Sequence, residues 1–114
     1  MGGGGSKGVA NPAQFVQGEL AKSGIVVFSK SYCPYCTSAK NALRKTGLSM
    51  EVHELDRMGE PRNGPVQQVL QSYSGEISVP QVFVGGKFFG TANKVEKLAG
   101  SGKLADELKK LGAA

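Results

Sequence analysis

The chain has 114 residues, of which 39% are hydrophobic and 20% charged, with a formal net charge of +5. This length suits one domain with a single hydrophobic core, and no apolar run approaches the roughly 20 residues of a transmembrane helix. The basic residues are scattered rather than gathered in a block, which disfavours nucleic-acid binding. We therefore expect a monomeric domain over residues 11–114 that binds neither nucleic acid nor a membrane.

The first ten residues predict a flexible leader, because the glycine run after Met1 offers nothing to bury. The two cysteines of the chain are too few for a secreted disulfide scaffold, and no signal peptide is recognisable. We expect a reducing compartment, the cytoplasm, or an organellar stroma or matrix if a transit peptide was removed.

The first half of the chain predicts two helices and two strands. Asn11 and Pro12 open a helix with a cap residue and a proline at the first helical position, and Ser23-Gly24 ends it. Residues 25–28 are β-branched and aromatic and predict a buried strand, followed by a helix over residues 37–46. Alternating apolar residues predict a second strand over residues 48–55.

The second half predicts a loop over residues 56–64, a helix over 65–73 and a strand over 81–84. Gly85-Gly86 then indicates a hairpin to a strand over residues 87–89, and two helices follow, the last over residues 103–111. Strands joined through a helix favour parallel pairing, whereas a hairpin is antiparallel. The predicted fold is therefore α/β and thioredoxin-like, a four-stranded mixed sheet with helices on both faces.

Both cysteines lie in Cys33-Pro34-Tyr35-Cys36, at the junction between the first strand and its helix. The thiolate is the nucleophilic form of cysteine, and a helix N-terminus stabilises it. The helix dipole supplies at most about 2 kcal/mol, so we expect N–H groups of the Tyr35–Cys36 turn and the charge of Lys30 to contribute. Cys36 lies one turn further in and should stay a thiol, so Cys33 is predicted to attack and Cys36 to resolve.

Three other interpretations of these residues are less favoured. A closed zinc site needs four ligands, and His53, on a predicted strand, is the only histidine. A structural Cys33–Cys36 disulfide would close too small a loop to stabilise the fold much. His53 is more simply a strand side chain than a catalytic base. We therefore favour a redox pair and expect no metal.

The motifs together resemble those of the dithiol glutaredoxins of class I. The resemblance rests on C-P-Y-C after Lys30-Ser31-Tyr32, on residues 78–83 (S-V-P-Q-V-F), and on Gly85-Gly86-Lys87 followed by Gly90. Glutaredoxins share the thioredoxin-like fold. Thioredoxins, in contrast, typically have tryptophan before C-G-P-C.

This resemblance implies glutathione-dependent reduction of protein disulfides and of glutathione mixed disulfides, with glutathione as co-substrate and disulfide-containing or glutathionylated proteins as partners. Some glutaredoxins instead share a [2Fe–2S] cluster between two subunits, held by one cysteine of each and two glutathiones. Pro34 stiffens the turn where cluster-binding members often have glycine or serine, so this alternative is the less favoured one.

The resemblance also implies roles for residues that would meet the glycine end of glutathione. Lys30 matches the lysine that meets its carboxylate, and Gln67 matches a glutamine that assists. From the helical pattern alone, Gln67 would instead be an exposed helix residue. Tyr35 would form one wall of the groove.

At the other end of glutathione, the implied contacts are with backbone groups. Val79 would pair with the cysteinyl part, and Pro80 would follow a cis peptide bond. The N–H groups of Asn93 and Lys94, at a helix start, would bind the γ-glutamyl carboxylate. The sequence departs from the family here, because Lys94 replaces an aspartate and Thr91 places a Cβ where a glycine is usual.

Overall fold

The computed structural model describes residues 9–114, so most of the predicted leader, residues 1–8, lies outside the described residues. The first helix, α1 (Pro12–Leu20), begins as predicted, because the side chain of Asn11 accepts a hydrogen bond from the N–H of Gln14 at 3.2 Å. This bond satisfies one of the free donors at the helix start.

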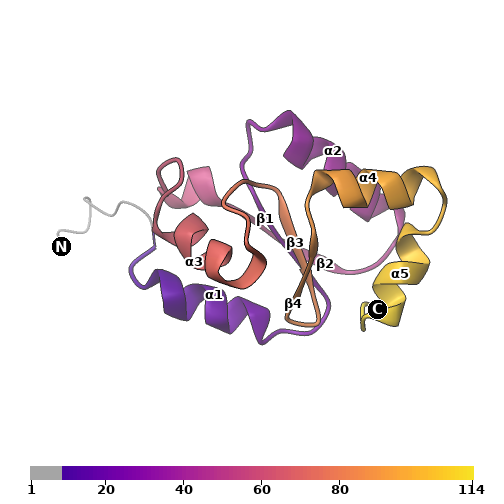
Figure 1. Cartoon of the computed structure of the whole chain (residues 1–114), viewed down its shortest axis with the longest axis horizontal. Helices are drawn as coiled ribbons and strands as arrows, with labels where there is room; N and C mark the ends of the chain where they lie inside the picture. The colour runs from indigo at the N-terminus through magenta and orange to yellow at the C-terminus, as the bar shows by residue number, and fades with distance from the viewer. Residues whose placement is uncertain (1–8) are drawn as a thin grey trace.

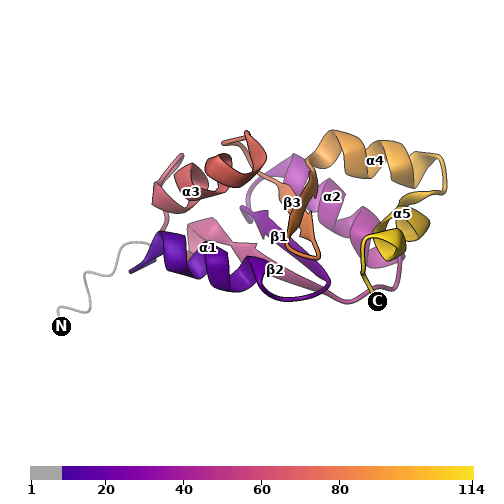
Figure 2. The same ribbon diagram turned by 60° about the horizontal axis from the view of Figure 1, so that its bottom comes forward.

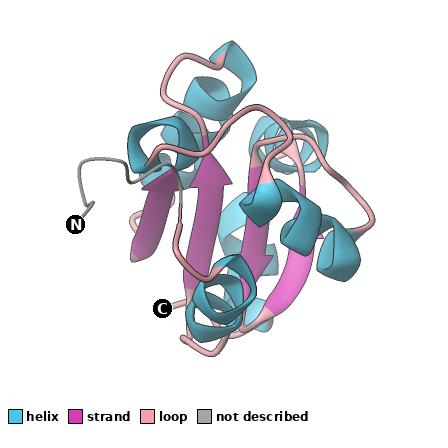
Figure 3. Cartoon of the chain, turned by 90° about the vertical axis from the view of Figure 1, so that its left-hand side faces the viewer, coloured by secondary structure: helices cyan, strands magenta, loops and turns pink. Residues whose placement is uncertain are grey.

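Four strands form one mixed sheet, in the order β2-β1-β3-β4 (Figure 3). Strand β1 pairs parallel with β2 and antiparallel with β3, and β3 pairs antiparallel with β4 across the predicted hairpin. The strands are β1 (Ile25–Ser29), β2 (Met50–Glu54), β3 (Gln81–Val84) and β4 (Lys87–Gly90). The predicted mixed, four-stranded sheet is confirmed.

Helices cover both faces of the sheet (Figures 1 and 2). Alternate residues of β1 point to opposite faces, so Val26 and Phe28 pack with α1 and α3, while Ile25 and Val27 pack with α2, α4 and α5. The remaining helices are α2 (Pro34–Lys45), α3 (Pro65–Ser74), α4 (Ala92–Gly100) and α5 (Leu104–Lys110). Among residues 9–114, every helix falls short of the length and apolarity that a bilayer crossing requires.

The main differences from the sequence prediction are at the start of α2 and in the segment after β2. Helix α2 begins at Pro34 rather than at residue 37, because Cys33 caps the helix and proline needs no hydrogen bond at the first helical position. The predicted loop over residues 56–64 opens with a 3-10 helix, Leu55–Met58, which also shortens the second strand. Leu55 is fully buried in the core and holds this turn against the sheet.

The rest of that loop is held by a buried carboxylate. Glu60 accepts hydrogen bonds from the N–H of Val66, at 2.8 Å, and of Val9, at 2.9 Å. Val66 lies in the first turn of α3, where backbone donors lack helical partners. Gly64 precedes that helix, and a Cβ there would lie 2.8 Å from the Pro61 ring. Glu60 and Gly64 therefore fix the start of α3.

Candidate active site

The two cysteines meet at the start of α2. The Sγ of Cys33 accepts a hydrogen bond from the N–H of Cys36 at 3.3 Å, as part of the helix cap. Both are free thiols, and Cys33 is partly exposed whereas Cys36 is fully buried. One sulfur is therefore open to a substrate, next to a peptide donor that favours negative charge. The expectation that the Cys36 N–H points at the Cys33 sulfur is confirmed.

The environment of Cys36 keeps its thiol protonated. Burial raises the pKa of Cys36 to about 11, and the hydrogen bond from the backbone N–H of Lys30 offsets this only in part. That N–H lies 3.5 Å from the Cys36 Sγ. Cys36 is therefore a buried, protonated thiol at neutral pH.

The loop before the cysteines is held by Asp56, a residue that the sequence analysis did not single out. The N–H of Ser31 donates to Asp56 Oδ1 at 2.9 Å, and the hydroxyl of Ser31 donates to Oδ2. Burial alone would raise the pKa of Asp56, but the two bonds from Ser31 hold it below its ordinary value. Asp56 therefore stays charged and fixes the turn that carries Lys30 and Tyr32.

A pocket of about 280 Å³ lies beside the exposed thiol. It is lined by Cys33, Lys30, Gln67 and Val79, four of the predicted site residues, and also by Arg62. Among residues 9–114, no carboxylate forms an ion pair with the Lys30 ammonium, although the residue is only 4% exposed. The pocket thus combines a lysine and an arginine with a partly exposed thiol.

Gln67 is not the exposed residue that the helical pattern alone suggests, because it is only 2% exposed. Its Oε1 accepts from the N–H of Asn63 at 3.0 Å, and its Nε2 donates to the carbonyl of Ile77 at 2.7 Å. Gln67 therefore ties the segment before α3 to the segment that leads to Val79. The helical periodicity missed this because both partners lie in loops.

An adjoining pocket of about 320 Å³ is lined by Tyr35, Val79, Pro80 and Asn93. Ser78 and Val79 line both pockets, so the two pockets are neighbours. The peptide bond between Val79 and Pro80 is cis, as the resemblance implied. Tyr35 is 68% exposed and stands at the rim.

The start of α4 leaves backbone donors free beside this second pocket. Thr91 caps the helix without a side-chain hydrogen bond, and its φ of −105° is ordinary extended backbone, so its Cβ causes no strain. Asn93 lines the pocket, whereas Lys94 does not. The Lys94 ammonium lies 4.4 Å from the centre of the Phe89 ring instead.

Several lining residues were missed by the sequence analysis: Tyr32, Arg62, Asn63, Ser78 and Ala92. Arg62 could have been predicted as a site residue, because it is a cation in a turn-rich segment just before the helix that contains Gln67. His53, which we expected to be a strand side chain, lies on β2 and lines neither pocket.

Comparisons with known proteins point to one family. The family model described as Glutaredoxin matches residues 25–89. A glutaredoxin of Vernicia fordii is 39% identical over 94 residues, which cover 82% of this chain and 88% of that protein.

Solved structures show the same fold. The holo form of glutaredoxin C1 from Populus tremula x tremuloides superposes with a TM-score of 0.76 at 31% identity, covering 89% of this chain and 98% of that one. A buckwheat glutaredoxin–glutathione complex gives a TM-score of 0.73 at 33% identity, covering 88% of this chain and 89% of that one. The chain belongs to the glutaredoxin family, whose members are glutathione-dependent thiol oxidoreductases.

Proposed function

We propose that this protein reduces glutathione mixed disulfides and protein disulfides, with Cys33 as the nucleophile and Cys36 as the resolving thiol. The observation that carries the proposal is the pairing of an accessible Cys33 thiol with a buried Cys36 thiol whose pKa is raised to about 11. Such an asymmetric pair supports one attacking and one resolving sulfur.

In the monothiol route, the Cys33 thiolate attacks the glutathionyl sulfur of a mixed disulfide. A new disulfide forms between Cys33 and glutathione while the old bond breaks, and the target leaves as a thiolate that takes up a proton. A second glutathione thiolate then attacks the glutathionyl sulfur on Cys33. Oxidised glutathione leaves, and Cys33 is again a thiolate stabilised by the Cys36 N–H.

In the dithiol route, Cys33 attacks a protein disulfide and becomes linked to the target. Cys36 then loses its proton and attacks the Cys33 sulfur, which releases the reduced target and leaves a Cys33–Cys36 disulfide for two glutathiones to reduce. Only the thiolate form of Cys36 can attack, and burial raises the pKa of Cys36. The dithiol route therefore requires that Cys36 become more exposed to solvent once Cys33 is linked to the target.

We propose that glutathione lies along the two adjoining pockets. Its glycine carboxylate would meet Lys30, with Gln67 shaping that end, and its cysteinyl backbone would pair with Val79 beside Pro80. Support comes from the lining of the first pocket and from the Lys30 ammonium, which has no ion-pair partner among the described residues.

The γ-glutamyl end would then reach the start of α4. The free N–H groups of Asn93 and Lys94 favour a carboxylate at this position. Tyr35, at the rim of the second pocket, would cover the middle of the peptide. The buckwheat glutaredoxin–glutathione complex, a structural relative, supports glutathione as the ligand.

The activity is tested by a glutathione-coupled assay on a small mixed disulfide, run beside a thioredoxin-reductase-coupled assay on the same protein. We expect turnover in the first assay alone. Turnover only with thioredoxin reductase would contradict the proposal.

Cys36→Ser is expected to keep the reduction of glutathione mixed disulfides and to lose the reduction of protein disulfides, because only the second route needs an internal resolving thiol. The check is to measure both substrates with the same enzyme preparation. Equal loss of both activities would show that Cys36 does more than resolve.

Lys94→Asp is expected to lower the KM for glutathione by up to about fivefold, or about 1 kcal/mol, since an exposed repulsive charge would become an attractive one for the α-amine. Lys97→Asp, one turn further along α4 and also exposed, is the matched control. An unchanged or higher KM in Lys94→Asp would refute this role.

The accessible Cys33 thiol also suits the alternative function, a [2Fe–2S] cluster held between two chains by one thiolate from each and two glutathiones. Visible absorption and a dimer after anaerobic purification would support it. A colourless monomer would favour the oxidoreductase alone. Either activity requires reduced glutathione, so we propose a reducing compartment, the cytoplasm or an organellar matrix or stroma.

A further inference from the structure

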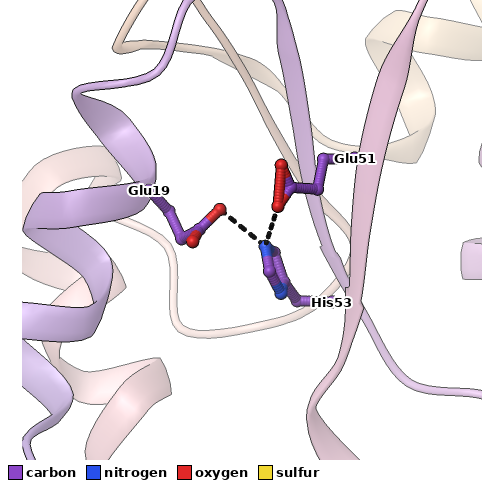
Figure 4. Close-up of side chains that lie close together, drawn as sticks. All are labelled: Glu19, Glu51 and His53. Atoms are coloured by element: carbon purple, nitrogen blue, oxygen red, sulfur yellow. Dashed lines mark hydrogen bonds and ion pairs between the residues drawn. The ribbon is translucent and has the colours of Figure 1, made fainter.

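We propose that Glu19, Glu51 and His53 form a binding site for a divalent transition-metal ion of the zinc type. Glu19 comes from α1, and the other two residues come from β2 (Figure 4). Their ligand atoms all lie within 4.8 Å of one another. None of the three lines the pockets beside Cys33, so this site is separate from the thiol chemistry.

The distances are close to those that a bound ion needs. Zinc–nitrogen and zinc–oxygen bonds of about 2.1 Å place neighbouring ligands of a tetrahedron about 3.4 Å apart. The His53 Nε2 lies 3.5 Å from Glu51 Oε2 and 2.7 Å from Glu19 Oε1. Glu19 has only to withdraw by a fraction of an ångström, and water can supply a fourth ligand.

Packing already orients two of the three ligands, His53 and Glu19, whereas the Glu51 side chain is 44% exposed. The His53 ring stacks on Phe28, with centroids 5.5 Å apart, and Phe15 meets it edge-on at 5.2 Å. Side-chain exposure is only 15% for His53 and 12% for Glu19, so both have limited freedom to move. A fixed imidazole loses little conformational entropy when it binds an ion.

The cluster already attracts a cation, the ammonium of Lys22. Its Nζ lies 2.8 Å from Glu51 Oε2 and 3.0 Å from Glu19 Oε2. The Lys22 ammonium therefore contacts both of the carboxylates that would bind the metal.

Lys22 can be displaced at little cost. Its side chain is 48% exposed and lies just beyond the end of α1, so the ammonium can turn into water. Exposed ion pairs contribute little to stability, because water solvates both charges when they separate. Lys22 should thus compete with the metal and weaken its binding without preventing it.

The donor set selects the class of ion. One imidazole nitrogen and two carboxylates suit Zn²⁺ and its neighbours in the first transition row, whereas Mg²⁺ and Ca²⁺ prefer sites made of oxygen alone. Because the ligands come from α1 and β2, a bound ion would also fasten that helix to the edge of the sheet.

The test uses untagged protein with Cys33→Ser and Cys36→Ser, so that thiolates cannot bind the metal. Zn²⁺ affinity is measured by calorimetry, and Co²⁺ absorption reports the ligand type. Three further variants are made in this background: His53→Gln, Glu19→Gln and Lys22→Gln. Glu107→Gln and Lys110→Gln are the matched controls, because these residues form an exposed ion pair on α5.

We expect one Zn²⁺ per chain, weakened about 10-fold or more by His53→Gln and by Glu19→Gln, and tightened several-fold by Lys22→Gln. The two control variants should stay within about twofold of the parent. Zn²⁺ binding that His53→Gln does not weaken would overturn the proposal. So would an absence of binding at about 1 mM Zn²⁺ in the parent, even if Lys22→Gln binds.

Discussion

Replacing Cys33 with serine is expected to lower kcat/KM for glutathione mixed disulfides by at least about 10³-fold. A serine hydroxyl is not ionised at neutral pH and forms no exchangeable bond with a disulfide sulfur. The cap geometry should survive, because serine is itself a good N-cap for α2. The glutathione-coupled assay measures the loss, and circular dichroism confirms the fold.

The matched variant is Cys36→Ser, which should retain turnover with the mixed disulfide. After incubation with oxidised glutathione, mass spectrometry should find one glutathione on Cys36→Ser and none on Cys33→Ser. Activity that survives in Cys33→Ser would reverse the assignment of the two sulfurs.

The second large effect concerns the ion pair between Lys40 and Glu54, which joins α2 to the end of β2. Lys40 Nζ lies 2.5 Å from Glu54 Oε2, and the two side chains are 8% and 23% exposed. Lys40→Met should lower the free energy of unfolding by about 2–3 kcal/mol, because it leaves the poorly hydrated Glu54 carboxylate without its partner. This loss is smaller than that expected for a fully buried ion pair, because Glu54 is partly exposed. Chemical denaturation measures the change.

The control is the double variant Lys40→Met with Glu54→Leu, which removes both charges and should recover most of the lost stability. Lys110→Met breaks the exposed pair with Glu107 and should cost less than about 0.5 kcal/mol. A loss in Lys40→Met no larger than that in Lys110→Met would show that burial adds nothing to this pair.

Local patterns predicted most of the fold. The β-branched run of β1, the Gly85-Gly86 hairpin and the proline starts of α1 and α3 each depend on neighbours in sequence. The cysteine pair at the start of α2 was predictable for the same reason. The cis bond before Pro80 was predicted only through the family resemblance, since composition and spacing do not distinguish it from an ordinary loop proline.

The features that sequence reasoning missed depend on contacts between distant segments. Asp56 holds Ser31, 25 residues away, and lies in a segment expected to be an irregular loop. Glu19 and His53, 34 residues apart, meet only because α1 packs over β2. Neither pairing leaves a periodic signal. The contacts that support the site therefore needed the structure, whereas the position of the cysteine pair at the start of α2 did not.

The most direct test of the assignment is selective alkylation of the reduced protein. Brief exposure to iodoacetamide at about pH 7, followed by peptide mass mapping, should label Cys33 and leave Cys36 unmodified, because Cys36 is buried and its pKa is raised to about 11. Labelling of Cys36 should rise only toward that pH. Equal or faster labelling of Cys36 at neutral pH would contradict the division between attacking and resolving thiol.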